Sequence, residues 1–281
     1  MKVCEINEEN LDEFASILGQ DIAADLERVF FRGLGVKNGD DEAVGALVYE
    51  LIGSESDQGT KSFIRLLKSD SNEAFGLMEK AYSRAEFFED EISQSFYEVS
   101  DEKSASEYGA VGFSVENRES DYLRITLGDL AGTEFAKKRK VPDHIKYLNE
   151  LSHMEYRCAV KDFLAKGHKG MLEDLAYLPL SWFEGDISVC STADDRVDGL
   201  FLVRATPSGM LIPMLYSAFG PYYAKNLFYM LFKSIERAMD KYPAETPIVI
   251  SRINKASWDV MSKIMPTARG DKVFCGVRQE P

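Results

Sequence analysis

The predicted order of helices and strands occurs twice along this 281-residue chain, and this repeat limits the possible folds more than any other feature. In each half, hydrophobic periodicity and turn residues predict two helical stretches, a hairpin, an apolar strand and then an alternating helix–strand series. We therefore expect two domains, at residues 1–130 and 131–281. The predicted fold is α/β (α+β), and each domain has a mixed, mostly antiparallel sheet flanked by helices.

The same patterns predict the individual elements. Residues 71–85 are expected to form a helix with Ser71 or Asn72 as its N-cap, because both side chains can accept a hydrogen bond from a first-turn amide. Four further expectations are a hairpin between residues 113–117 and 122–127, one long helix over 143–166, a second helix over 170–183 and a closing strand over 272–278.

The charge distribution excludes some classes of partner. The net charge is −17 for residues 1–130 and +3 for residues 131–281, or −14 overall. An acidic surface repels a phosphate backbone, which disfavours nucleic-acid binding as the main role. The one basic run, residues 137–140, has no interleaved aromatic residues and is expected to be a solvated linker.

The chain has the features of a cytoplasmic protein. No apolar run reaches the ~20 residues of a membrane span, and the acidic N-terminus predicts no secretory signal. Four cysteines without a C-x-x-C motif are expected to be reduced thiols. The three histidines are not spaced as metal ligands on one helix face, so we expect no metal site.

Residues 101–113, DEKSASEYGAVGF, predict a short helix that ends before a Gly-Phe pair. Taken alone, the stretch favours Gly112 as a C-cap and Tyr108 as a packing residue. Its register also resembles the last helix of the GNAT superfamily, the acyl-CoA-dependent N-acyltransferases. Asp101 stands at the usual Asn, Ser104 at a small residue, Tyr108 at the tyrosine, and Gly112-Phe113 at the Gly-Phe pair.

The resemblance implies an activity and a co-substrate. It implies two tandem GNAT-like domains, acetyl-CoA or coenzyme A as co-substrate, and Tyr108 as the general acid that protonates the leaving thiolate. In the second half the same register places Asn254 at the Asn, where the resemblance implies a contact with the pantetheine arm. Met261 replaces the tyrosine there.

The resemblance also implies a glycine-rich pyrophosphate loop, which neither half contains in full. In the first half this junction carries Asp70 and Glu73, which would repel phosphate. The second half offers a partial loop, so we expect any acyl-CoA site within residues 210–260. The cofactor-binding candidates there, besides Asn254, are Ser217, Phe219, Gly220, Tyr222, Lys225 and Asn226.

Two functions remain open at this stage. One is an N-acyltransferase with one degenerate domain, whose acceptor is a small-molecule or peptide amine. The other is a catalytically silent tandem protein that binds a ligand, peptide or partner in the groove between its domains. Either form is compatible with a homodimer.

Overall fold

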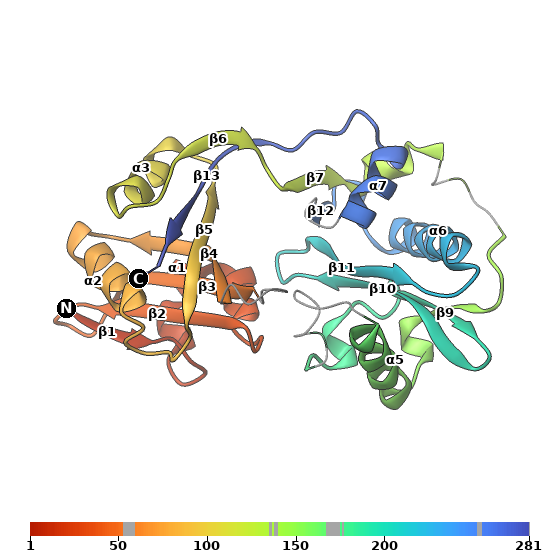
Figure 1. The fold of residues 1–281 in the computed structure, drawn as a ribbon, viewed down its shortest axis with the longest axis horizontal. Coiled ribbons are helices and arrows are strands. Elements are labelled where there is room, and N and C mark those ends of the chain that lie inside the picture. The colour runs from red at the N-terminus through yellow and green to blue at the C-terminus, as the bar shows by residue number, and fades with distance from the viewer. Residues whose placement is uncertain are drawn as a thin grey trace. The chain divides into compact units, whose positions relative to one another are not determined.

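The computed structural model describes residues 1–52, 60–134, 137, 140–166, 175, 177–251 and 255–280 (Figure 1). The described residues form two compact units. The first contains residues 1–118 and 272–280, and the second contains residues between 119 and 271. The division thus lies before the predicted boundary at 130/131, and the C-terminal strand belongs to the first unit.

The first unit contains one mixed sheet with helices on both faces. Its strands, in spatial order, are β1 (Lys2–Glu5), β2 (Phe31–Lys37), β3 (Ala43–Ile52), β4 (Thr60–Ser69), β5 (Ile92–Val99), β13 (Lys272–Gln279) and β6 (Glu116–Glu119). Its helices are α1 (Leu11–Asp25), α2 (Asn72–Ser83) and α3 (Glu102–Ala110). Ser71 caps α2, as predicted, because its hydroxyl accepts a hydrogen bond from the Ala74 amide.

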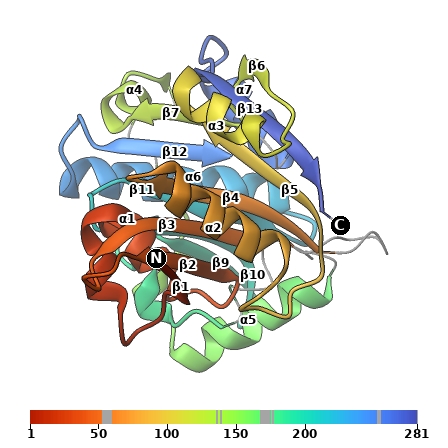
Figure 2. The same ribbon diagram turned by 90° about the vertical axis from the view of Figure 1, so that its left-hand side faces the viewer.

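Alternation along the central strands divides the core of this unit between the two faces of the sheet. On β3, Leu47 and Tyr49 pack in one cluster with Met78 of α2, whereas Val48 packs in another with Phe14 of α1. Side chains of a strand alternate between faces, so one run of apolar residues serves both helices. Figure 2 shows α2 in front of this sheet.

The second unit also contains one mixed sheet. Its strands, in spatial order, are β7 (Tyr122–Thr126), β12 (Pro247–Ser251), β11 (Leu211–Ala218), β10 (Arg196–Ala205), β9 (Val189–Ala193) and β8 (Ile145–Tyr147). Its helices are α4 (Leu127–Ala131), α5 (His153–Ala165), α6 (Tyr223–Lys241) and α7 (Lys255–Ile264), with 3-10 turns η2 (Leu148–Glu150) and η4 (Leu180–Trp182). Figure 1 shows α5 and α6 on opposite faces of this sheet.

The two sheets exchange strands, and this exchange contradicts two predictions. The strand predicted to close the second half, β13, lies in the first sheet, where Phe274–Gln279 pairs antiparallel with β5. The predicted hairpin between 113–117 and 122–127 does not form, because β6 joins the first sheet and β7 the second. The Leu123 and Ile125 side chains of β7 are buried in the core of the second unit.

Gly276 allows β13 to lie against the backbone of Ser114. A Cβ atom at this residue would lie 1.7 Å from the Ser114 carbonyl oxygen, so only glycine permits the close approach of the two backbones. The Ser114 amide donates a hydrogen bond to Val277 O on the same strand, at 3.0 Å. The contact therefore depends on the residue type at position 276.

Two helix predictions in the second half are also wrong. Residues 143–166 do not form one helix: Ile145–Tyr147 pairs with β9, and α5 begins only after Ser152. Ser152 and Glu155 form a capping box that fixes this start. Of residues 170–183 the structure describes 175 and 177–183; none of these is α-helical, and Leu180–Trp182 forms a 3-10 turn.

Candidate functional site

The parallel strands β11 and β12 of the second unit are registered at one position only. Leu211 pairs with Ile248, and the ladder ends there although β11 continues to Ala218. In the first unit, β4 and β5 are registered from Thr60 to Ile64, and β4 continues to Ser69. In each described sheet the ladder of the parallel pair thus ends before the longer strand does.

The loop between β11 and α6 leaves the start of α6 uncapped. Gly220 has a φ of +83° and nothing lies within 4 Å of a Cβ built there, so this left-handed position is both unstrained and open. Tyr222 is the N-cap residue of α6 and makes no side-chain cap hydrogen bond. The first turn contains no acidic residue and includes the exposed Lys225. This helix end therefore suits an anion.

The equivalent helix start in the first unit is less suited to an anion. At the start of α2 the Ser71 hydroxyl already accepts a hydrogen bond from the Ala74 amide, at 3.2 Å, and Glu73 lies in the first turn. A side-chain cap and a carboxylate both compete with a bound phosphate. The start of α6 therefore suits an anion better than the start of α2 does, which is the difference that the sequence predicts.

Asn226 is held by the protein itself. Its side chain is only 4% exposed, and its amide group donates to Asp198 Oδ2 at 3.3 Å while His144 Nε2 lies 3.1 Å from its Oδ1. Ser191 in turn donates to Asp198 Oδ1 at 2.5 Å. This chain of side chains (the polar chain, Ser191–Asp198–Asn226–His144) joins β9, β10, the segment before β8 and α6. Asn226 is thus placed to support the helix start.

The backbone of Asp198 also supports the loop. Its carbonyl oxygen accepts a hydrogen bond from the Phe219 amide, at 2.7 Å. The Phe219 ring packs edge-on against Phe163 of α5, with 4.6 Å between centroids, and Lys166 Nζ lies 4.5 Å from its centre. Phe219 therefore anchors the loop to α5.

The remaining predicted candidates lie at different depths. Ser217 is partly buried near the end of β11, whereas the side chains of Tyr222 and Tyr223 are exposed at the start of α6. Asn254 lies outside the described residues. The six described candidates follow one another along the chain from the end of β11 to the first turn of α6: Ser217, Phe219, Gly220, Tyr222, Lys225 and Asn226.

Tyr108 lies in the core of the first unit. Its side chain is 3% exposed, and its ring stacks on Tyr97 and meets Phe113 edge-on. Burial raises the pKa of Tyr108 far above its ordinary value, with a smaller contribution from Tyr97. These contacts are those of a packing residue.

The sequence places Tyr216 of β11 among aromatic residues expected in the core or lining a groove, and not among the catalytic candidates. Its hydroxyl is buried and has no hydrogen-bond partner among the described residues, and burial raises its pKa well above the ordinary value. The ring packs against Phe201 with 5.0 Å between centroids, and the cluster that surrounds it includes Met261 of α7. The only sequence signal was its place two residues before the end of an apolar strand.

The described residues contain no group of three or more His, Cys, Asp or Glu side chains that could hold a metal ion. Among the same residues, no helix combines the length and apolar character needed to cross a bilayer. The free thiols of Cys190 and Cys275 are buried, and burial raises the pKa of both.

No protein-family model matches this sequence, and no curated protein matches it. Solved structures nevertheless share its fold. A tandem GNAT protein from the clavulanic acid biosynthesis pathway aligns with a TM-score of 0.62 at 11% identity, over 100% of this chain and 98% of that chain. A GCN5-related N-acetyltransferase from Kribbella flavida gives 0.53 at 14% identity, over 99% of this chain and 71% of its own.

A third structure, a GCN5-related N-acetyltransferase from Anabaena variabilis, gives a TM-score of 0.52 at 11% identity, over 100% of this chain and 73% of its own. The fold prediction is therefore confirmed: the two mixed sheets with flanking helices match the fold of a tandem GNAT protein. At these identities the likeness concerns the fold alone.

Proposed function

We propose that this chain is an acyl-CoA-dependent N-acyltransferase of the GNAT type and that its second unit holds the acyl-CoA. The observation that carries the proposal is the β11–β12 pair, whose ladder ends after Leu211–Ile248 while the same strand leads into the uncapped start of α6. An extended arm can hydrogen-bond along a strand beyond the end of its ladder, and a pyrophosphate can bind at the amino end of a helix. Support for the proposal comes from the fact that the ladder end and the helix start belong to one segment of the chain.

The residues of this segment fit coenzyme A. Gly220 lets a phosphate approach the backbone, the first-turn amides of α6 supply donors, and Lys225 supplies a positive charge. The alternative location is disfavoured by Glu73 and by the net charge of −17 on residues 1–130. Like charges beside a phosphate cost on the order of 1 kcal/mol per pair even near the surface.

A bound acyl-CoA supplies the activated thioester, from which the acyl group is transferred to an amine nitrogen. Such a transfer needs a proton donor for the departing sulfur. We assign this role to Tyr216, because its buried hydroxyl has no hydrogen-bond partner among the described residues. Tyr222 and Tyr223 are the exposed alternatives.

Calorimetric titration of acetyl-CoA into the full chain tests the location of the site. Lys225→Glu reverses a charge in the first turn of α6 and is expected to weaken binding about tenfold, or ~1.4 kcal/mol. Lys80→Glu makes the same charge change at an exposed position on α2 and is expected to leave the affinity unchanged. Equal effects of the two substitutions, or no binding by the wild type, would remove the support for this site.

One observation favours a second candidate function, a binding protein without catalysis. The position that resembles the family's general acid in the first unit, Tyr108, is in the core, and Met261 occupies it in the second. Mass spectrometry of a mixture of primary amines incubated with acetyl-CoA separates the two functions. Acetylated product that disappears with Tyr216→Phe supports the enzyme; binding without product supports the silent protein.

A further inference from the structure

The first unit contains a pocket of about 580 Å³ that the proposed function does not use. Three segments form it: the end of α2, the start of β5 and the end of β13. Its lining residues are Tyr82, Ser83, Ala85, Glu91, Ile92, Ser93, Gln279 and Glu280. The volume is in the usual range for a small-molecule site. The pocket adjoins the beginning of β5, whereas the β4–β5 ladder ends farther along, at Ile64 and Tyr97.

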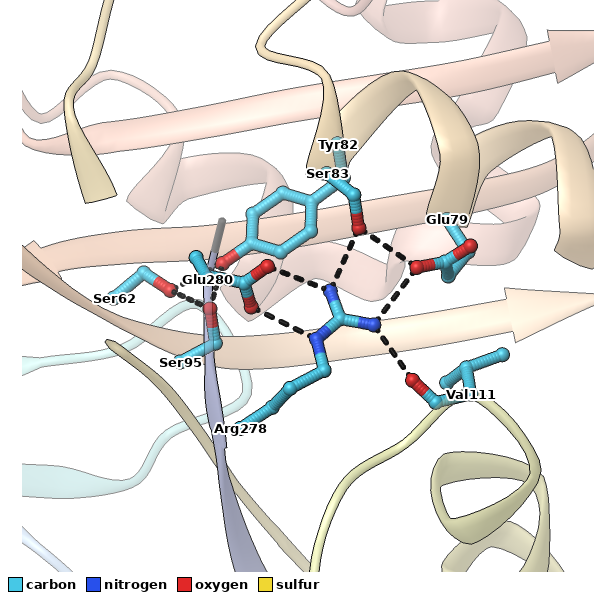
Figure 3. Close-up of polar contacts among 8 residues, drawn as sticks. All are labelled: Ser62, Glu79, Tyr82, Ser83, Ser95, Val111, Arg278 and Glu280. Atoms are coloured by element: carbon cyan, nitrogen blue, oxygen red, sulfur yellow. Dashed lines mark hydrogen bonds and ion pairs between the residues drawn. The ribbon is translucent and has the colours of Figure 1, made fainter. Parts of the chain in front are cut away.

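One side of this pocket rests on a rigid group of polar side chains (Figure 3). Arg278 of β13 donates to Glu280 through Nε and Nη2, to Glu79 and the Val111 carbonyl through Nη1, and to Ser83 through Nη2. All these distances lie between 2.7 and 3.0 Å. The wall next to Ser83 and Glu280 is therefore preformed.

The Tyr82 ring is fixed in the same way. Its hydroxyl contacts the buried hydroxyls of Ser62 and Ser95, the latter at 2.5 Å. Burial raises the pKa of Tyr82 to about 12, so the phenol is neutral at physiological pH. Together with Ile92, this ring gives the pocket an apolar surface of fixed shape.

The charge around the pocket is negative. The Arg278 guanidinium faces two carboxylates, Glu79 and Glu280, so this cluster carries one negative charge in excess. Glu91 adds a second carboxylate to the lining, which contains no basic side chain. This excess of negative charge attracts a bound cation.

The helix end adds to this preference. The backbone of Ala85 is left-handed, with φ at +50°, and its amide and that of Glu86 donate to the carbonyls of Tyr82 and Ala81. This arrangement ends α2 at the wall of the pocket, and the C-terminal end of a helix attracts positive charge.

We propose that this pocket binds a small organic cation, a primary amine with a compact apolar body that packs on Tyr82 and Ile92. The amine nitrogen lies toward Glu91 and the end of α2. The proposal concerns the first unit alone and is independent of acyl transfer.

Titration of the full chain with 2-phenylethylamine tests the proposal, because this probe combines an ammonium group with one aromatic ring. We expect saturable binding in calorimetry or ligand-detected NMR at about millimolar concentration. The neutral 2-phenylethanol and the anionic 3-phenylpropionate have the same ring, and neither is expected to bind. Equal binding of the amine and the alcohol, or no saturable binding of the amine, would overturn the proposal.

A matched pair of substitutions locates the bound amine. Glu91→Gln removes a carboxylate from the lining at an exposed position and is expected to weaken amine binding about threefold. Glu89→Gln makes the same change two residues away, at an exposed position outside the lining, and is expected to leave binding unchanged. A similar loss with both variants would mean that the amine responds to overall charge and not to this pocket.

Discussion

The rings of Tyr97 and Tyr108 lie face to face, with 3.9 Å between their centroids and 5° between their planes. Phe113 closes the cluster edge-on to both rings, with 5.4 Å between centroids in each case. Aromatic groups of this kind contribute mainly by burial and ring contacts. The tyrosine that the sequence offers as a general acid is thus fixed within the first core.

Tyr108→Phe is therefore expected to leave acyl transfer and acetyl-CoA affinity unchanged. Tyr108→Ala removes the stacked ring and is expected to lower the free energy of unfolding by about 3–5 kcal/mol. Chemical denaturation and an acetylation assay check both outcomes. A large fall in turnover with Tyr108→Phe in a stable protein would indicate that Tyr108 takes part in catalysis.

Arg278→Met is expected to destabilise the first unit. The substitution leaves Glu79 and Glu280 without their shared partner, and breaking a mostly buried ion pair costs about 3–5 kcal/mol. Arg269→Met is the matched control, because among the described residues that guanidinium is bonded only to the nearby carbonyls of Pro266 and Ala268. Equal unfolding free energies for the two variants would show that the Arg278 contacts contribute little.

Asn226→Ala tests whether this residue is structural. The change leaves Asp198 and His144 without a common partner and is expected to lower the free energy of unfolding by about 1–3 kcal/mol. The exposed Asn72→Ala is a control of the same chemistry. If Asn226 instead contacts coenzyme A directly, affinity will fall while stability stays that of the wild type.

The contribution of Glu184 to the free energy of unfolding is expected to depend on pH. Burial tends to raise the pKa of this carboxyl, but hydrogen bonds from Lys241 and Tyr242 outweigh it, and the net pKa is lowered from 4.5. A lowered carboxyl pKa stabilises the fold above the unfolded pKa, and the gain is lost as pH falls through the folded pKa. The stability difference between wild type and Glu184→Gln should be largest near neutral pH and shrink below about pH 4.5.

Thermal or urea unfolding from pH 3 to pH 8 measures this difference. The pKa of Lys241 is raised, chiefly by its bond to Glu184, so its own contribution persists through neutral pH. A stability difference that stays constant across the acid range would mean that the Glu184 bonds do not form in solution.

Many helices and strands could be predicted from the sequence, because the patterns that predict them involve neighbouring residues. The apolar run of β3, the cap at Ser71 and the amphipathic pattern of α6 each depend on neighbouring residues. The Gly220 loop is similarly visible, since the residue types around it are close in sequence. These features are also the ones that locate the proposed acyl-CoA site.

The strand exchange was not predictable in this way. The alternating apolar residues of β7 and β13 suit either sheet equally well, and the choice depends on contacts far along the chain. Arg278, for example, meets Glu79 across 199 positions. Ile145 and Leu148 are spaced as in a helix, yet pairing with β9 makes the first of them part of a strand. Long-range pairing outweighed local periodicity at each of these places.

The central claim is that the second unit holds the acyl-CoA, and hydrogen–deuterium exchange of the full chain with and without acetyl-CoA tests it most directly. Bound co-substrate protects the backbone amides that it covers or orders. The account predicts slower exchange in residues 211–226, across β11 and the start of α6, and no change in residues 60–75. Protection confined to residues 60–75, or to neither segment, would contradict it.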